Sequence, residues 1–205
     1  MRLQTSILAL ALGTGFALTG PAIAQDTDEM IASAMSAGPS SLAENATITD
    51  RAGNVLREGT NGWTCFPDNP DADGNDPWCF NAPWGAFLAA YGAGEPFEAT
   101  SMGIAYMLAG DAPTSNTDPY ATGPTEDNDW ISVMGGHLMI VLPGEDPYAG
   151  YSSDPYNGGP FVMWGGTPYA HLMVPIDTAH MDHMNHMPMD DGEAHDDMDH
   201  GDHME

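Results

Sequence analysis

The chain contains Gly135-Gly136-His137-Leu138-Met139-Ile140-Val141-Leu142-Pro143 and repeats the centre of this stretch as His171-Leu172-Met173-Val174-Pro175. Both copies are apolar runs with β-branched residues, bounded by Gly or Pro, which predicts two short strands. Because side chains at i and i+2 of a strand share a face, His137 is expected beside Met139, and His171 beside Met173. If the two strands are neighbours, their imidazoles and thioethers form a ligand set soft enough for Cu(I). The alternative is that all four side chains are core packing.

Other apolar segments predict the remainder of the sheet. Further strands are expected at 46–50 and 54–58, paired as a hairpin, and at 62–66, 102–108, 130–133 and 161–164. Strands therefore outnumber helices, and most connections are too short for a crossover helix. The pattern predicts an α+β fold, with a largely antiparallel β-sheet and two short helices.

The two helices are expected at 26–37 and directly after Asn81. Asp26 or Thr27 can cap the first, which ends before Gly38. Asn81 can cap the second, with Gly92 just past its end. In this second helix, Trp84, Phe87, Leu88 and Tyr91 recur at helical spacing and predict a core face.

The N-terminus has the pattern of an export signal. Arg2 precedes an apolar stretch, and Ala22-Ile23-Ala24 has the small residues of a cleavage site, so residues 1–24 are predicted to be a signal peptide. No Cys follows the predicted cut, and no membrane anchor is expected. The chain then divides into a single globular domain, 25–176, and a tail, 177–205. This organisation predicts a periplasmic or secreted bacterial protein.

The charge of the chain excludes two classes of partner. The formal net charge is −27, and the chain contains no Lys. Such a surface repels nucleic acid and anionic membranes and attracts cations. Metal ions are therefore the expected partners.

Cys65 and Cys79 are the only cysteines. In an exported chain they are predicted to form a disulfide bond, since a thiolate metal site needs more Cys or a nearby His. Between them, Asn69, Asp71 and Asp73 precede Gly74 with the spacing that starts a calcium loop. The bidentate carboxylate that ends such a loop is missing, so a solvated acidic turn is the favoured interpretation and Ca²⁺ the weaker one.

Three motifs carry a resemblance to other proteins: Asn61-Gly62-Trp63-Thr64-Cys65-Phe66-Pro67-Asp68, Ser115-Asn116-Thr117-Asp118-Pro119-Tyr120, and the segment from Gly159-Pro160-Phe161-Val162-Met163-Trp164 to Pro175. They resemble a set of secreted bacterial proteins of uncharacterised activity, over most of the domain. This resemblance implies no particular reaction or ligand.

The tail has the clearest chemistry. It holds six of the eight histidines in the chain, and it has too little apolar bulk to fold alone, so it is predicted to be disordered. Its candidate metal ligands are His180, Met181, His183, Met184, His186, Met187 and Met189. This segment resembles the Met/His-rich segments of bacterial periplasmic copper-resistance proteins, which implies copper. Thioethers favour Cu(I), while imidazole and carboxylate also suit Ni or Zn. The alternative is an acidic solubilising tail.

Enzyme motifs are missing from the sequence. There is no Gly-x-Ser-x-Gly, no His-Glu-x-x-His and no phosphate-binding loop. We therefore expect a binding protein: an exported copper-binding protein that buffers, sequesters or delivers the metal. Its affinity is expected to weaken as the pH falls through ~6.5, the ordinary pKa of His. The alternative is a module for a small extracellular ligand such as a sugar, with Trp63, Trp78 and Trp130 lining a groove and a calcium-braced acidic loop.

Overall fold

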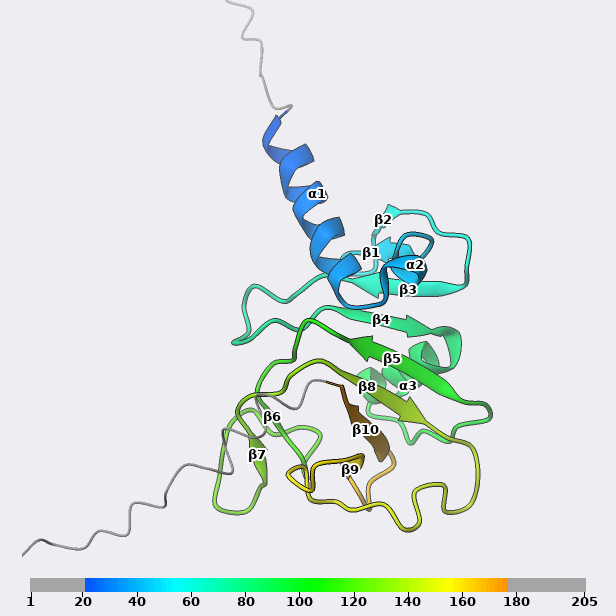
Figure 1. Ribbon diagram of the computed structural model, residues 1–205, viewed down its shortest axis with the longest axis vertical. Helices are drawn as coiled ribbons and strands as arrows, with labels where there is room; N and C mark the ends of the chain where they lie inside the picture. The colour runs from blue at the N-terminus through cyan, green and yellow to red at the C-terminus, as the bar shows by residue number, and fades with distance from the viewer. Residues whose placement is uncertain (1–20, 177–205) are drawn as a thin grey trace, which may run out of the picture.

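The structure, a computed structural model, describes residues 21–176, with side chains from Asp26 onward. Its main element is an eight-stranded sheet in the order β2-β1-β3-β4-β5-β8-β10-β9 (Figure 1). The strands are β1 (Thr47–Thr49), β2 (Val55–Arg57), β3 (Trp63–Phe66), β4 (Trp78–Asn81), β5 (Gly103–Met107), β8 (His137–Val141), β9 (Phe161–Met163) and β10 (His171–Pro175). β1 pairs with β3 in parallel, and the other neighbours in this sheet are antiparallel. The prediction of a mixed fold with a largely antiparallel sheet is confirmed.

The described chain has three helices rather than the two predicted: α1 (Pro21–Ser36), α2 (Ser40–Ala43) and α3 (Ala82–Ala93). α1 begins upstream of Asp26 and Thr27, so neither caps it. At α3, the side chain of Asn81 accepts a hydrogen bond from the amide of Trp84, which confirms the predicted cap. The helix ends at Gly94, two residues beyond the predicted end, where a left-handed φ of 69° suits a residue without Cβ.

Two strand predictions need correction. The segment at 130–133 does not join the main sheet: β7 (Trp130–Ile131) pairs with β6 (Thr114–Ser115) in a separate two-stranded sheet. β4 was not predicted, because this strand has only four residues, the last of which is the cap of α3, and is too short to show a period. It nevertheless joins β3 to β5 in the centre of the sheet.

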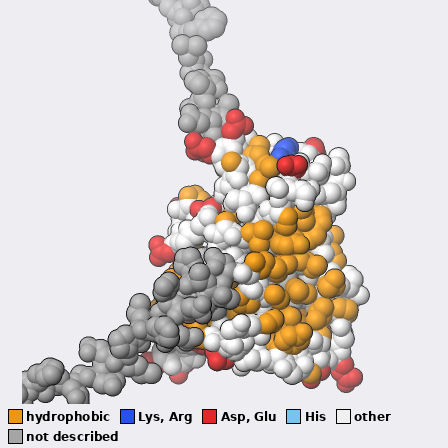
Figure 2. All heavy atoms as spheres, viewed as in Figure 1, with side chains coloured by type: hydrophobic (Ala, Val, Ile, Leu, Met, Phe, Trp, Pro, Cys, Tyr) orange, Lys and Arg blue, Asp and Glu red, His pale blue; other side chains and the backbone are white. Residues whose placement is uncertain are grey.

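The sheet separates two apolar cores. α3 covers one face, where Trp84, Phe87, Met107, Met139 and Met173 are all buried. α1 covers the part of the other face formed by the first strands, and its small residues pack there against Ile48 and the two cysteines. In the view of Figure 1, apolar side chains gather over β4, β5, β8 and β10 on the face turned away from α3 (Figure 2).

The predicted disulfide bond between Cys65 and Cys79 is confirmed. The two residues are directly opposite each other on β3 and β4, and both are fully buried beneath α1. Within residues 21–176, no helix is both long enough and apolar enough to cross a membrane. Residues 1–20 of the predicted signal peptide and the tail from Asp177 lie outside the described residues, while residues 21–24 form the start of α1.

We expect the double variant Cys65→Ala, Cys79→Ala to lose up to about 3 kcal/mol in its free energy of unfolding, because the bridge restrains the unfolded chain. Denaturant unfolding with and without a reducing agent measures this loss. Reductant should destabilise the parent chain and leave the double variant unchanged. An equal response of the two proteins to reductant would contradict this prediction.

Candidate functional site

A small cavity of about 80 Å³ lies between α3 and the sheet. Its walls are mostly aromatic or thioether side chains: Trp78, Trp84, Phe87, Leu88, Tyr91, Met139, Met163 and Trp164, together with His171, Asp111 and Thr114. Several polar atoms around it are buried without a hydrogen-bond partner, including the Nε1 atoms of Trp78 and Trp84 and the Nε2 atom of His171. Unpartnered buried polar atoms are costly and mark a place where a ligand can bind.

His171 is the most informative residue of the cavity wall. Its side chain is 1% exposed, and its Nδ1 lies 2.9 Å from the carbonyl oxygen of Tyr169. A carbonyl only accepts, so Nδ1 carries the proton and Nε2 keeps a free lone pair. Burial lowers the pKa of His171 to about 4, despite the opposing hydrogen bond to Tyr169. The imidazole is therefore neutral at pH 7, oriented, and ready to coordinate a metal through Nε2.

Two thioethers line the same cavity. Met163 on β9 is directly opposite His171 on β10. Met139 on β8 is directly opposite Met173, which has the same orientation as His171, two residues along β10. Met139 and Met163 are both buried, at 3% exposure each. One imidazole and two thioethers thus line a single small cavity, and they are a donor set suited to a soft monovalent ion.

Aromatic rings surround His171 on several sides. The rings of Trp164 and Trp84 lie edge-on to it, with centroids 4.9 and 5.6 Å away. Trp164 is the single non-glycine residue of the described chain with a positive φ, at 55°. Its indole Nε1 donates to the carbonyl of Ser115, and its amide to that of Asn116, both at 2.8 Å. The chain accepts backbone strain here to hold this ring in place, a feature concentrated at functional sites.

His137 repeats the geometry of His171 without reaching the cavity. Its Nδ1 lies 2.8 Å from the carbonyl oxygen of Gly135, its Nε2 has no hydrogen-bond partner, and burial lowers its pKa to about 4. Its Nε2 lies 3.6 Å from Oδ2 of Asp111, a residue that does line the cavity. Burial raises the pKa of Asp111 to about 7. Both shifts favour a neutral pair over an ion pair.

The structure places the four predicted strand residues on one face of the sheet but at different positions. Met139 and Met173 are directly opposite each other, and His137 is opposite Pro175. His171 precedes Leu172, which pairs with Ile140, so it lies towards the other end of the two strands. The backbone positions of the two histidines are therefore offset by four residues, or ~13 Å, along the strands, at ~3.3 Å per residue. Of the four residues, His171 and Met139 line the cavity, with Met163 as the additional thioether.

The seven tail ligands from His180 to Met189 lie outside the described residues. Within residues 21–176, no group of three or more His, Cys, Asp or Glu side chains is placed to hold a metal ion.

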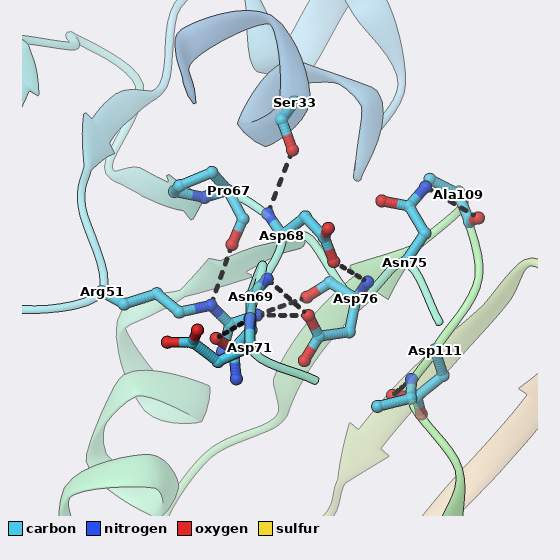
Figure 3. Close-up of polar contacts among 11 residues, drawn as sticks. Ser33, Arg51, Pro67, Asp68, Asn69, Asp71, Asn75, Asp76, Ala109 and Asp111 are labelled. Atoms are coloured by element: carbon cyan, nitrogen blue, oxygen red, sulfur yellow. Dashed lines mark hydrogen bonds and ion pairs between the residues drawn. The ribbon is translucent and has the colours of Figure 1, made fainter. Parts of the chain in front are cut away.

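The acidic loop between the cysteines is held by its own hydrogen bonds (Figure 3). Oδ1 of Asp76 lies 2.6 Å from the Arg51 guanidinium and also accepts from the amide of Asn69. Oδ1 of Asp68 accepts from the amide of Asp76, and the side chain of Asn69 accepts from the amide of Asp71. The side-chain oxygens of Asp68, Asn69 and Asp76 thus act as acceptors that stabilise the turns of this loop.

Sequence reasoning missed Asp111, Met163 and the role of Trp164. Met163 lies in a predicted strand, but only the register of β9 against β10 places it opposite His171. Asp111 belongs to a long loop without periodicity. The Trp164 position had one available signal, the turn-forming Gly165-Gly166 that follows it.

Comparison of the chain with protein-family models, with curated proteins and with solved structures found no match. The function of this chain is therefore inferred from the geometry of the cavity and from the composition of the tail.

Proposed function

We propose that this chain is an exported copper-binding protein, with a Cu(I) site in the cavity and additional, more exposed sites in the Met/His-rich tail. The observation that carries the proposal is the free Nε2 of His171 at the wall of a cavity that Met139 and Met163 also line. Imidazole and thioether are neutral donors, and a neutral set in a mostly apolar cavity favours a monovalent ion over a divalent one.

The surroundings of His171 support the same ion. Trp84 and Trp164 pack almost perpendicular to the imidazole and surround it with apolar rings, and an apolar surrounding accommodates a monovalent ion at lower cost than a divalent one. The net charge of −27 raises the local concentration of any cation. Ni or Zn fits this cavity less well, because both prefer harder ligands than two thioethers.

The tail and the cavity have complementary roles in this proposal. The tail offers many His-Met pairs for capture, and it follows β10 in the sequence, leaving that strand at its Pro175 end, four residues from His171. An ion bound at His180 or Met181 can pass to the cavity by ligand exchange. The protein then buffers or sequesters copper, or delivers it to a partner.

The sugar-binding alternative receives no comparable support. The three tryptophans that it requires do not share one surface. Trp63 packs beside Tyr106 at 5.5 Å in the core beneath α1, Trp78 lines the buried cavity, and Trp130 lies in β7 of the small sheet.

The pH dependence of binding tests the proposal and separates the two kinds of site. Because burial lowers the pKa of His171 to about 4, the cavity should keep its affinity well below the ~6.5 expected of an ordinary imidazole. Anaerobic Cu(I) titration against a coloured competing chelator, at pH 7 and pH 5, measures this. A chain ending at Ile176 should bind one tight equivalent at both values.

The full chain is the matched control in this experiment. It should bind several equivalents at pH 7 and fewer at pH 5, as ordinary imidazoles become protonated and stop binding metal. Circular dichroism verifies that the shortened chain is folded. A folded chain ending at Ile176 that binds no Cu(I) at either pH would refute the cavity site.

A further inference from the structure

A continuous stack of aromatic rings joins the cavity to the surface. Trp164, in edge contact with His171, stacks on Tyr91 with centroids 5.4 Å apart and an interplanar angle of 17°. Tyr91 stacks in turn on Tyr120, at 5.2 Å and 8°. Trp164 and Tyr91 are partly buried and Tyr120 is 54% exposed, so exposure increases along the series towards the surface.

The protein holds this stack in place with several hydrogen bonds. The hydroxyl of Tyr91 donates to the carbonyl of Pro119, at 2.6 Å, which fixes the residue before Tyr120. The hydroxyl of Tyr120 lies 3.0 Å from that of Tyr169, which donates to the carbonyl of Glu95. Thus the long loop at 109–128 has a role: it holds Trp164 through Ser115 and Asn116, and it carries Tyr120.

We propose that the stack of Trp164, Tyr91 and Tyr120 is an electron route between copper held at His171 and a redox partner at the surface. This inference rests on the proposed function. Electron transfer weakens exponentially with distance, and it weakens less through rings in contact than across gaps or saturated side chains. A buried ion that no partner can touch therefore exchanges electrons most readily along these rings.

The electron balance of the step is simple. Bound Cu(I) loses one electron and becomes Cu(II), and a strong one-electron outer-sphere acceptor beside Tyr120 gains it; the acceptor must be strong because a donor set that favours Cu(I) raises the reduction potential of the copper. No bond forms or breaks, and no proton moves. The tyrosine hydroxyls keep their protons because the acceptors of Tyr91 and Tyr169 are backbone carbonyls, which are not bases. Burial also raises the pKa of Tyr91.

Stopped-flow oxidation of the Cu(I)-loaded full chain tests this route. Tris(phenanthroline)cobalt(III) is a suitable oxidant, because its positive charge favours encounter with this acidic protein and its size excludes it from a cavity of about 80 Å³. The double variant Met139→Leu, Met163→Leu identifies which kinetic phase belongs to the cavity copper. That phase should be present in the parent chain and missing from the double variant. Copper in the tail should be oxidised equally in all variants.

Tyr120→Leu and Tyr91→Leu should slow the cavity phase by about tenfold or more, which corresponds to ~1.4 kcal/mol in activation free energy. Tyr151→Leu is the matched control, because Tyr151 is similarly exposed, at 47%, and forms no part of the stack. It should leave the rate unchanged. Because Tyr120 is half-exposed, its variant still tests the route if Tyr91→Leu fails to fold.

Two results would overturn different claims. If the tyrosine variants bind Cu(I) as tightly as the parent chain and the cavity phase keeps its rate in Tyr120→Leu, the electron route is wrong and the copper site stands. If the parent chain shows no phase that depends on Met139 and Met163, the copper site itself is wrong, and the route falls with it.

Discussion

Replacing both cavity thioethers with leucine, as Met139→Leu and Met163→Leu, is expected to lower the affinity of the buried site for Cu(I) by about 100-fold or more. Loss of a residue that only supports a metal ligand typically lowers affinity by ~10–100-fold, and loss of two ligands should exceed that. Leucine has nearly the volume of methionine, so packing is largely conserved while the soft donor atoms are lost. Chelator competition at pH 5, where ordinary imidazoles are protonated, measures the affinity with little contribution from histidines of the tail.

Met173→Leu is the matched control for this experiment. Met173 is fully buried on the same face of the sheet and lies directly opposite Met139, but it does not line the cavity. Its replacement should leave Cu(I) affinity within a factor of about two, and stability within ~1.5 kcal/mol. An equal loss of affinity in Met173→Leu and in the double variant would show that the ligands are not those that line the cavity.

The pH dependence of stability should show the opposite effects of the buried histidines and of Asp111. His137 and His171 have pKa values lowered to about 4 from 6.5, so the unfolded state binds their protons first. Their contribution to stability is complete above pH ~6.5 and is lost as the pH falls towards 4, by up to about 3 kcal/mol for each imidazole. Asp111 has a pKa raised to about 7 from 3.8, so its contribution is complete below pH 4 and is lost as the pH rises through 7.

Asp111→Asn separates these two contributions, because asparagine resembles the neutral carboxyl and does not titrate. The parent chain should lose roughly 2–3 kcal/mol in its free energy of unfolding as the pH falls from 7 to 4. The two histidines lose their contribution to stability over this range, and the contribution regained by Asp111 offsets part of that loss. The variant should be more stable than the parent at pH 7, with the difference vanishing near pH 4. Denaturant unfolding across this range measures both curves. Parallel curves for the two proteins would show that Asp111 is ionised in the folded chain.

Local signals in the sequence predicted much of the fold, and they failed where pairing partners matter. The hairpin of β1 and β2, the cap at Asn81 and the Cys65–Cys79 bridge each depend on residues with strong local preferences, and all are confirmed. β4 and the separate pairing of β7 were not predictable, because such short segments become strands only through the partners that the fold places beside them.

The sequence by itself determined the repeated His-x-Met pattern, the side of the strand on which each pair lies, and the acidic, Met/His-rich character of the tail. The alternation of a strand and the chemistry of the side chains are local properties, so they need no tertiary contact. Only the tertiary structure decided which of these residues line one cavity, because register is set by the packing of whole strands. That packing placed Met163 beside His171, moved His137 away from it, and buried both imidazoles deeply enough to keep them neutral.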